Sequence, residues 1–312
     1  MDFTKILREL TQIHAPSGHE QAVADYIENA AAKFGTVTRQ PNGNIIVHKP
    51  GTGEKKLMLV CHMDSAGMVL TNLEKDGQAR LGLVGAIDNS ALCGARVRFA
   101  NGAPGLITLE KGADVSKAKV TDFYLDLVPE NAKTGDTAVF APVFEQVGDK
   151  LMCAGLDSAA GCAVLLAALE QMEKPDCQIY AVFAVQNHFG FKGVKTAAFE
   201  VEPDVAVVLG AVEQTGFSPG DGAGVMIMDK SVACSEWVAD GLKAAAAMAE
   251  RECVPYICET ATPVKFIAAT GSGAAVGALG FAVKHANSAN QMVSEKDLQD
   301  CAQILAGFAG NV

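Results

Sequence analysis

The sequence predicts an α/β protein whose alternating strands and helices are interrupted by an all-β segment. Residues 56–61 (KLMLVC) form a continuous apolar run, which is typical of a strand buried on both faces. A strongly apolar helix is predicted over 158–172, and another buried strand follows at 178–185. Between about 68 and 150, short β-type runs alternate with Gly, Asn and Asp turns, and no long helix is predicted.

The chain opens with two predicted helices. The first has apolar residues at helical spacing over 3–13. Ser17 and Glu20 have the spacing of a capping box, in which each side chain binds the backbone amide of the other, and they predict the start of the second helix. A strand pair is predicted around residues 42–44, before the buried strand at 56–61.

The all-β segment divides the α/β pattern into two parts. Its predicted strands cover 68–73, 79–84, 95–99, 106–109, 123–128 and 138–144. After it, the predicted elements are a helix at 158–172, a strand at 178–185, a helix at 191–198, strands at 204–209 and 224–228, a helix at 235–251, a strand at 281–285 and a helix at 294–308. We therefore predict an α/β domain made of residues 1–67 and 151–312, with a small all-β domain inserted at 68–150.

Composition excludes several classes of function. The chain has 312 residues, of which 49% are hydrophobic, so it can bury a large core. A net charge of −11 argues against nucleic-acid and anionic-membrane partners. Nine scattered cysteines without a Cys-x-x-Cys pair indicate reduced core thiols, and the first residues look like an amphipathic helix rather than a signal peptide. No apolar stretch has the length of a bilayer span. We therefore expect a cytoplasmic protein.

Two short motifs at predicted strand and helix ends suggest metal chemistry. His62 follows a buried strand, where it could bind a metal while Asp64 orients its ring. Asp157 lies between a turn and an apolar helix, where its carboxylate could bridge two cations. Taken alone, a strand-end histidine is more often a satisfied surface or core residue, and Asp157 is equally typical of a helix N-cap. The order of motifs along the chain favours the functional interpretation.

That order resembles the tetrahedral-aminopeptidase family, which includes glutamyl aminopeptidases and proteins often labelled endoglucanases. The resemblance covers nearly the whole chain. It is carried by residues 15–20 (APSGHE), 61–67 (CHMDSAG), 155–166 (GLDSAAGCAVLL), 182–198 (VFAVQNHFGFKGVKTAA), 203–210, 230–235 and 291–298 (QMVSEKDL). It implies a mixed-sheet α/β/α domain of the zinc-peptidase type with an inserted β-barrel-like dimerisation domain, whose dimers build shells of twelve subunits.

The resemblance also implies a centre of two divalent metals, usually Zn, Co or Mn. Three residues match that centre: His62 as the first ligand, Asp64 as its supporting carboxylate and Asp157 as the bridging ligand. All three are retained, but a metal on His62 and Asp157 would lack its third ligand, because that position is Gly210.

The remaining positions of the implied centre are replaced. The Glu that serves as general base in the family falls on Asn187, and the ligand Glu beside it falls on His188. A ligand Asp falls on Gly210, and the last ligand, a His, falls on Asn287. An amide does not ionise near neutral pH, so Asn187 cannot take a proton from water as a carboxylate does.

These replacements predict an impaired or inactive metallo-aminopeptidase homologue, kept as a binding or structural homo-oligomer that could hold a peptide or small molecule. Two metals are not expected, because too few anionic ligands remain to offset their repulsion. One divalent ion (Zn, Co or Mn) on His62, Asp157 and His188 remains chemically reasonable. The alternative is therefore an active aminopeptidase with a rearranged mononuclear site, with Asp64, His285 or Glu213 as substitute bases. A third possibility is co-assembly with an active paralogue.

Overall fold

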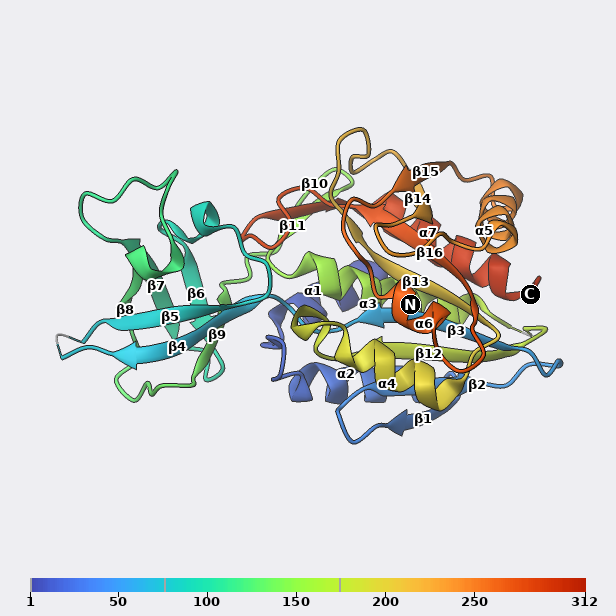
Figure 1. Ribbon diagram of the computed structural model, residues 1–312, viewed down its shortest axis with the longest axis horizontal. Helices are drawn as coiled ribbons and strands as arrows, with labels where there is room; N and C mark the ends of the chain where they lie inside the picture. Colours follow the sequence, from blue (N-terminus) through green and yellow to red (C-terminus); the bar gives the residue numbers. More distant parts are fainter. Residues whose placement is uncertain (1, 76, 174) are drawn as a thin grey trace.

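A computed structural model of the chain describes residues 2–75, 77–173 and 175–312. Figure 1 shows a large α/β part beside a smaller all-β part, whose described residues form no long helix. The predicted fold class, a mixed-sheet α/β protein with an inserted β-barrel, is therefore confirmed.

The large part is built on an eight-stranded mixed sheet. In spatial order its strands are β1 (Thr36–Arg39), β2 (Ile45–Lys49), β12 (Gln178–Ala184), β3 (Lys56–His62), β13 (Val205–Val212), β16 (Ala275–Ala282), β14 (Ala223–Met228) and β15 (Cys253–Ile257). The four central strands β12, β3, β13 and β16 run parallel, and antiparallel pairing begins at β2 on one side and at β14 on the other. Parallel strands covered on both faces require apolar runs, which explains the pattern of the sequence.

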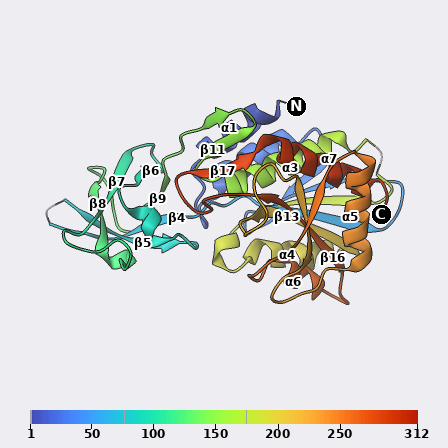
Figure 2. The same cartoon turned by 90° about the horizontal axis from the view of Figure 1, so that it is seen from above.

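Helices cover both faces of this sheet (Figure 2). The apolar core on one face includes residues of α1 (Phe3–Gln12), α2 (Gln21–Ala31), α3 (Leu156–Gln171), α5 (Glu236–Met248) and α7 (Glu295–Ala309). The core on the other face includes residues of α4 (Lys192–Val201) and α6 (Val264–Ala268). The helix α3 is buried around nearly its whole circumference, because its side chains are small or apolar on every side.

The smaller part is a closed six-stranded barrel. Around the barrel the strands are β4 (Gly67–Leu73), β5 (Ala79–Val84), β8 (Phe123–Leu127), β7 (Pro104–Leu109), β6 (Arg96–Phe99) and β9 (Thr137–Phe140). It encloses its own apolar core, which includes Met68, Leu70, Ile107 and Phe123. Closure pairs every strand with two neighbours, so the barrel has no free edge.

Short elements complete the fold. A three-stranded sheet joins β10 (Glu145–Val147), β11 (Lys150–Cys153) and β17 (Gln291–Ser294). Single 3-10 turns are η1 (Asn89–Leu92), η2 (Val120–Asp122) and η3 (Asn187–Phe189). The predicted capping box at the second helix is wrong. Glu20 instead accepts backbone N–H groups from Gly18 and Gln186, both at 2.8 Å, while the Ser17 hydroxyl is buried without a hydrogen bond to any described residue.

One buried amide ties the N-terminal half of the sheet to the segment around α4. Asn44 is completely buried, and its Nδ2 donates to Gln40 Oε1 and to the Gly193 carbonyl at 2.8 Å. Its Oδ1 accepts the N–H of Val185 at 2.9 Å. A Cβ added at Gly193 would lie 2.4 Å from Asn44 Oδ1, so only glycine fits there. The contact joins two segments 149 residues apart in the chain.

We expect Asn44→Ala to lower the free energy of unfolding by about 1–3 kcal/mol, because it leaves the buried N–H of Val185 without an acceptor and removes the bonds to Gln40 and Gly193. Urea denaturation followed by circular dichroism measures this loss. Asn29→Ala, on the exposed side of α2, is the control and should change stability by less than about 0.5 kcal/mol. Equal effects of the two substitutions would contradict a special role for the buried amide.

His14 links the N-terminal region to the barrel. One ring nitrogen, Nε2, lies 3.0 Å from the hydroxyl of Thr137. Burial lowers the pKa of His14 to about 4, and the positive charge of the nearby His19 adds to the effect. The unfolded chain has an ordinary histidine pKa near 6.5 and therefore binds this proton more readily than the folded chain. The contribution of His14 to stability is thus complete above about pH 6.5 and is lost as the pH falls towards 4.

Replacing His14 by Gln removes this titration. We expect the midpoint of urea unfolding to fall more steeply between pH 6.5 and pH 4.5 for the unmodified protein than for His14→Gln. All other titrating groups are shared, so the difference between the two curves isolates His14. Parallel curves would show that the burial of this ring has no effect on stability.

Candidate metal centre

The carboxyl ends of the four parallel strands and the loops that follow them enclose a cavity of about 1010 Å³. Open α/β sheets bind their ligands at this edge. The sequence-predicted positions that line the cavity are His62, Asp157, Asn187, His188, Gly210 and Asn287. Asp64 does not line it and is completely buried beside His62. The structure therefore gathers every predicted site residue into one region.

His62 is the last residue of β3 and interacts with Asp64 in two ways. Its Nδ1 lies 2.9 Å from the Asp64 backbone carbonyl and 3.6 Å from the Asp64 carboxylate oxygen Oδ1. Burial acts to lower the pKa of His62, but the hydrogen bond and negative charge of Asp64, with that of Asp157, outweigh it and raise the pKa to about 9. Burial acts to raise the pKa of Asp64, but the interaction with His62 outweighs it and holds that pKa below the usual range.

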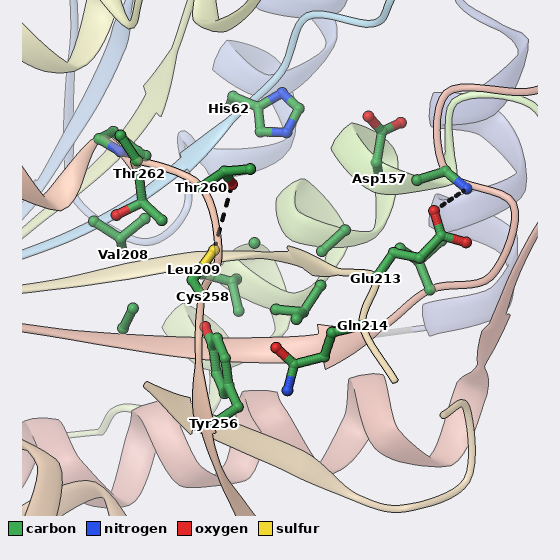
Figure 3. Close-up of a pocket in the computed structure, with 18 of the residues that line it drawn as sticks. His62, Asp157, Val208, Leu209, Glu213, Gln214, Tyr256, Cys258, Thr260 and Thr262 are labelled. Carbon is green, nitrogen blue, oxygen red and sulfur yellow. Dashed lines mark hydrogen bonds between the residues drawn. The ribbon is translucent and has the colours of Figure 1, made fainter. Parts of the chain in front are cut away.

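Asp157 lies in the first turn of α3, not at the N-cap, which is Gly155 in the left-handed conformation. Its backbone N–H donates to the side-chain oxygen of Gln291 at 2.8 Å. Its carboxylate oxygen Oδ1 is buried and accepts no hydrogen bond from the described residues. Figure 3 shows the Asp157 side chain at the border of the pocket, on a different element from His62.

His188 belongs to the turn η3 and packs against the barrel. Its backbone N–H donates to Asp64 Oδ2 at 3.2 Å. A Cβ added at Gly85, just after β5, would lie 2.9 Å from His188 Nδ1, so the ring fits only because residue 85 is glycine. The rings of His62 and His188 meet edge to face, with centroids 5.7 Å apart. Burial lowers the pKa of His188, and its Nε2 is buried without a partner in the described structure.

Two further replaced positions, Gly210 and Asn287, also line the cavity. Gly210 lies near the end of β13, and no described atom lies within 4 Å of a Cβ added there, so a side chain would have room. Asn287 has a left-handed backbone, with φ of 54°, and its Oδ1 is buried without a described partner. The Glu213 carboxylate fixes this turn by accepting the N–H groups of His285 at 2.6 Å and Ala286 at 3.2 Å.

The structure groups a small set of possible metal ligands in this region. Within the described ranges, one group of three metal-ligating side chains has its ligand atoms within 4.8 Å of one another: His62, Asp64 and His188. Several buried acceptor atoms in this region have no partner in the structure, and a bound ion or water would satisfy them. Gly210, at the position of the implied third ligand beside His62 and Asp157, offers no side-chain ligand.

Comparison with known proteins identifies the family. The family model for the M42 glutamyl aminopeptidases matches residues 43–304. The chain belongs to this family. It is 30% identical to a protein of Acetivibrio thermocellus named "Putative aminopeptidase", over 97% of both chains. It is also 24% identical to the glutamyl aminopeptidase of Lactococcus lactis, over 66% of this chain and 65% of the relative.

Solved structures show the same M42 fold. An aminopeptidase from Desulfurococcus kamchatkensis superposes with a TM-score of 0.94 and 24% identity, over 99% of this chain and 95% of the other. The TET1 peptidase of Pyrococcus horikoshii superposes with a TM-score of 0.89 and 23% identity, with full coverage of both chains. These likenesses establish the fold. The resemblance inferred from the sequence motifs is therefore confirmed, and the protein is an M42 metallo-aminopeptidase homologue.

Sequence reasoning missed the opposite wall of the cavity. This wall is formed by residues 255–263, which include Tyr256, Cys258 and Thr260 (Figure 3). Asp229 holds the segment by accepting hydrogen bonds from both the N–H and the hydroxyl of Thr262, at 2.7 and 2.6 Å. No local pattern marks these residues as pocket residues.

In the part of the chain that the structure describes, no helix is long and apolar enough to cross a bilayer.

Proposed function

We propose that this M42 homologue is catalytically impaired or inactive and is retained as a binding or structural oligomer. The observation that carries the proposal is that Asn187, which lines the cavity, stands at the position of the general-base Glu implied by the family. Hydrolysis of a peptide bond requires a group that takes a proton from the attacking water, and an amide cannot do so near neutral pH. Loss of a general base typically costs a factor of about 10²–10⁴ in rate.

A shortage of anionic ligands supports the same proposal. When bound, two divalent ions would polarise the scissile carbonyl and activate water, but about 3.5–4 Å apart they repel each other and need carboxylates around them. Of the implied ligands, only Asp157 is still a carboxylate that lines the cavity, since Gly210 has no side chain and His188 is neutral or cationic. The Glu213 carboxylate is engaged by two backbone N–H groups.

An active mononuclear aminopeptidase is the second candidate function. His62, Asp157 and His188 all line the cavity, and two imidazoles with one carboxylate form a known zinc-binding set. In this candidate Asp64 keeps its supporting role and holds the His62 ring from behind. Release of amino acids from the N-termini of peptides, with one metal bound, is the activity it predicts.

The oligomeric part of the proposal concerns the inserted barrel. We propose that residues 68–150 form a dimerisation domain inserted into an α/β domain made of 1–67 and 151–312. A peptidase from Pyrococcus horikoshii with the same fold, at 23% identity, is described as assembling into a tetrahedron or an octahedral shell. This supports dimers and a dodecamer for the present chain, either alone or with an active paralogue. Light scattering measures the assembly directly.

Purified protein should contain fewer than two equivalents of Zn, Co or Mn per chain and should release amino acids from peptides at least about 100-fold more slowly than an intact M42 aminopeptidase. Elemental analysis and a peptide panel supplemented with each metal measure the two quantities. Asp157→Ala is the control for any residual release. Two tightly bound equivalents with ordinary turnover would overturn the proposal, and one equivalent with turnover that requires Asp157 would favour the mononuclear candidate.

Restoring the replaced side chains should restore function. The restoring variant combines Asn187→Glu, His188→Glu, Gly210→Asp and Asn287→His. We expect it to bind two equivalents of Co²⁺ and to gain at least about 100-fold in kcat/KM, because the base and the missing ligands return and the space beside Gly210 admits a carboxylate.

The matched control carries the same four changes together with Asp157→Asn, which removes the bridging carboxylate and should abolish the gain. A restoring variant that is folded and loaded with two metals but still inactive would show that these four positions do not account for the loss of activity.

A further inference from the structure

A second groove lies where the inserted barrel meets the α/β part. Its volume is about 760 Å³, and it shares no lining residue with the cavity of the candidate metal centre. Its lining residues come from the start of α2 and the segment before it, from residues 42–43 and 185–186, and from the barrel segment 98–102 with Thr137. This junction groove therefore touches both parts of the chain and is separate from the strand-end chemistry.

Arg98 brings a positive charge to the junction groove without an acidic partner. It lies on β6, and its guanidinium donates to the backbone carbonyl of Gln12 at 2.5 Å and to the Gln12 side-chain oxygen at 3.3 Å. Both acceptors are uncharged. A guanidinium has five N–H donors, and the described residues use two of those of Arg98. Burial lowers the pKa of Arg98, and no carboxylate of the described residues opposes that effect. A half-buried cation of this kind favours an anionic partner.

Two histidines extend the positive region. His19 is exposed and lines the groove, as does His14, whose Nε2 lies 3.0 Å from the Thr137 hydroxyl. After burial, the positive charges of His19 and Arg98 are the influences that lower the pKa of His14 most. The pKa of His14 therefore reports a positive electrostatic potential in the groove, which a bound anion would offset.

The acidic residue of the groove is already engaged elsewhere. Glu20 is the one acid among the described lining residues, and it is 6% exposed. Its Oε1 accepts the backbone N–H groups of Gly18 and Gln186, both at 2.8 Å. Burial raises the pKa of Glu20, and these two N–H groups, which oppose burial, are the next largest influences. The Glu20 carboxylate thus serves the turn before η3 and leaves Arg98 without a counter-charge.

We propose that the junction groove binds a small organic anion, whose carboxylate or phosphate group is held by Arg98 and His19. The planar fork of a guanidinium matches two oxygens of either group. The N-terminus of α2, which no side chain caps, lines the same groove and adds a partial positive charge. Ile13, Phe99 and Val185 give the groove an apolar surface for the carbon skeleton of the ligand. The site does not depend on whether the protein is an active peptidase.

The bound anion would link the two parts of the molecule. Arg98 belongs to the barrel, whereas His19 belongs to the segment that leads into α2 of the α/β part. A ligand that contacts both residues binds the folded chain and not the unfolded one, so it raises the midpoint of thermal unfolding. The anion therefore stabilises the packing of the barrel against the α/β part.

Isothermal titration of the full chain tests the groove with inorganic phosphate in one arm and succinate in the other. A pH of about 6 keeps an ordinary histidine mostly protonated, and sodium chloride at equal ionic strength controls for screening. Saturable binding of phosphate supports a phosphate ligand, and saturable binding of succinate supports a carboxylate ligand. No saturable binding of either anion up to about 10 mM would overturn the inference.

Variants locate the bound anion. Arg98→Gln should weaken its binding at least about 10-fold and His19→Gln at least about 3-fold, because each removes a charged hydrogen-bond donor. The matched control is Arg96→Gln, an exposed arginine of the same strand that does not line the groove, and it should change the affinity less than about 2-fold.

Circular dichroism shows whether each variant is folded, and His19→Gln, at an exposed position, tests the site if Arg98→Gln is not. Equal losses for Arg96→Gln and Arg98→Gln, or unchanged affinity in both Arg98→Gln and His19→Gln, would contradict the site. None of these results bears on metal content or peptidase activity, so the junction groove and the proposed function can fail separately.

Discussion

Parallel pairing of β12, β3, β13 and β16 brings the carboxyl ends of four strands to one edge of the sheet, and every feature of the candidate site depends on that arrangement. His62 ends β3, Gly210 lies near the end of β13, and the turn with His188 follows β12. Apolar side chains on both faces hold the strands in this register, so the edge persists whatever polar residues it carries. The fold is therefore physically compatible with different polar side chains at this edge.

Electrostatics at this edge differs from that of a two-metal peptidase. A two-metal centre requires carboxylates to offset the repulsion of its ions. Here the remaining buried charge is organised around the His62 and Asp64 pair, in which the carboxylate and the imidazole stabilise each other's charged forms. His188 adds a ring where a carboxylate is implied, and the glycine at position 85 provides the space for it. The side chain at residue 187 is an amide, which does not accept a proton near neutral pH.

Several features were predictable from sequence because they depend on local patterns. Continuous apolar runs predicted the buried strands, and short runs between turns predicted the all-β segment, whereas its barrel form was implied only by the family resemblance. The capping box at Ser17 was predicted wrongly, because Glu20 binds the N–H of Gln186, far along the chain. The role of Glu213 as a clamp on the turn before Asn287 was equally hidden, since its partners lie 72 and 73 residues away.

The sequence by itself determined the fold class, the family and the identities of the side chains at the strand ends, because periodicity and ordered motifs are properties of the chain. Only the tertiary structure decided which of those side chains touch. It placed Asp64 rather than Asp157 beside both histidines, brought the barrel against His188, and added residues 255–263 as a wall of the cavity. These contacts join segments that are far apart in the sequence, so strand order, loop conformation and packing determine them.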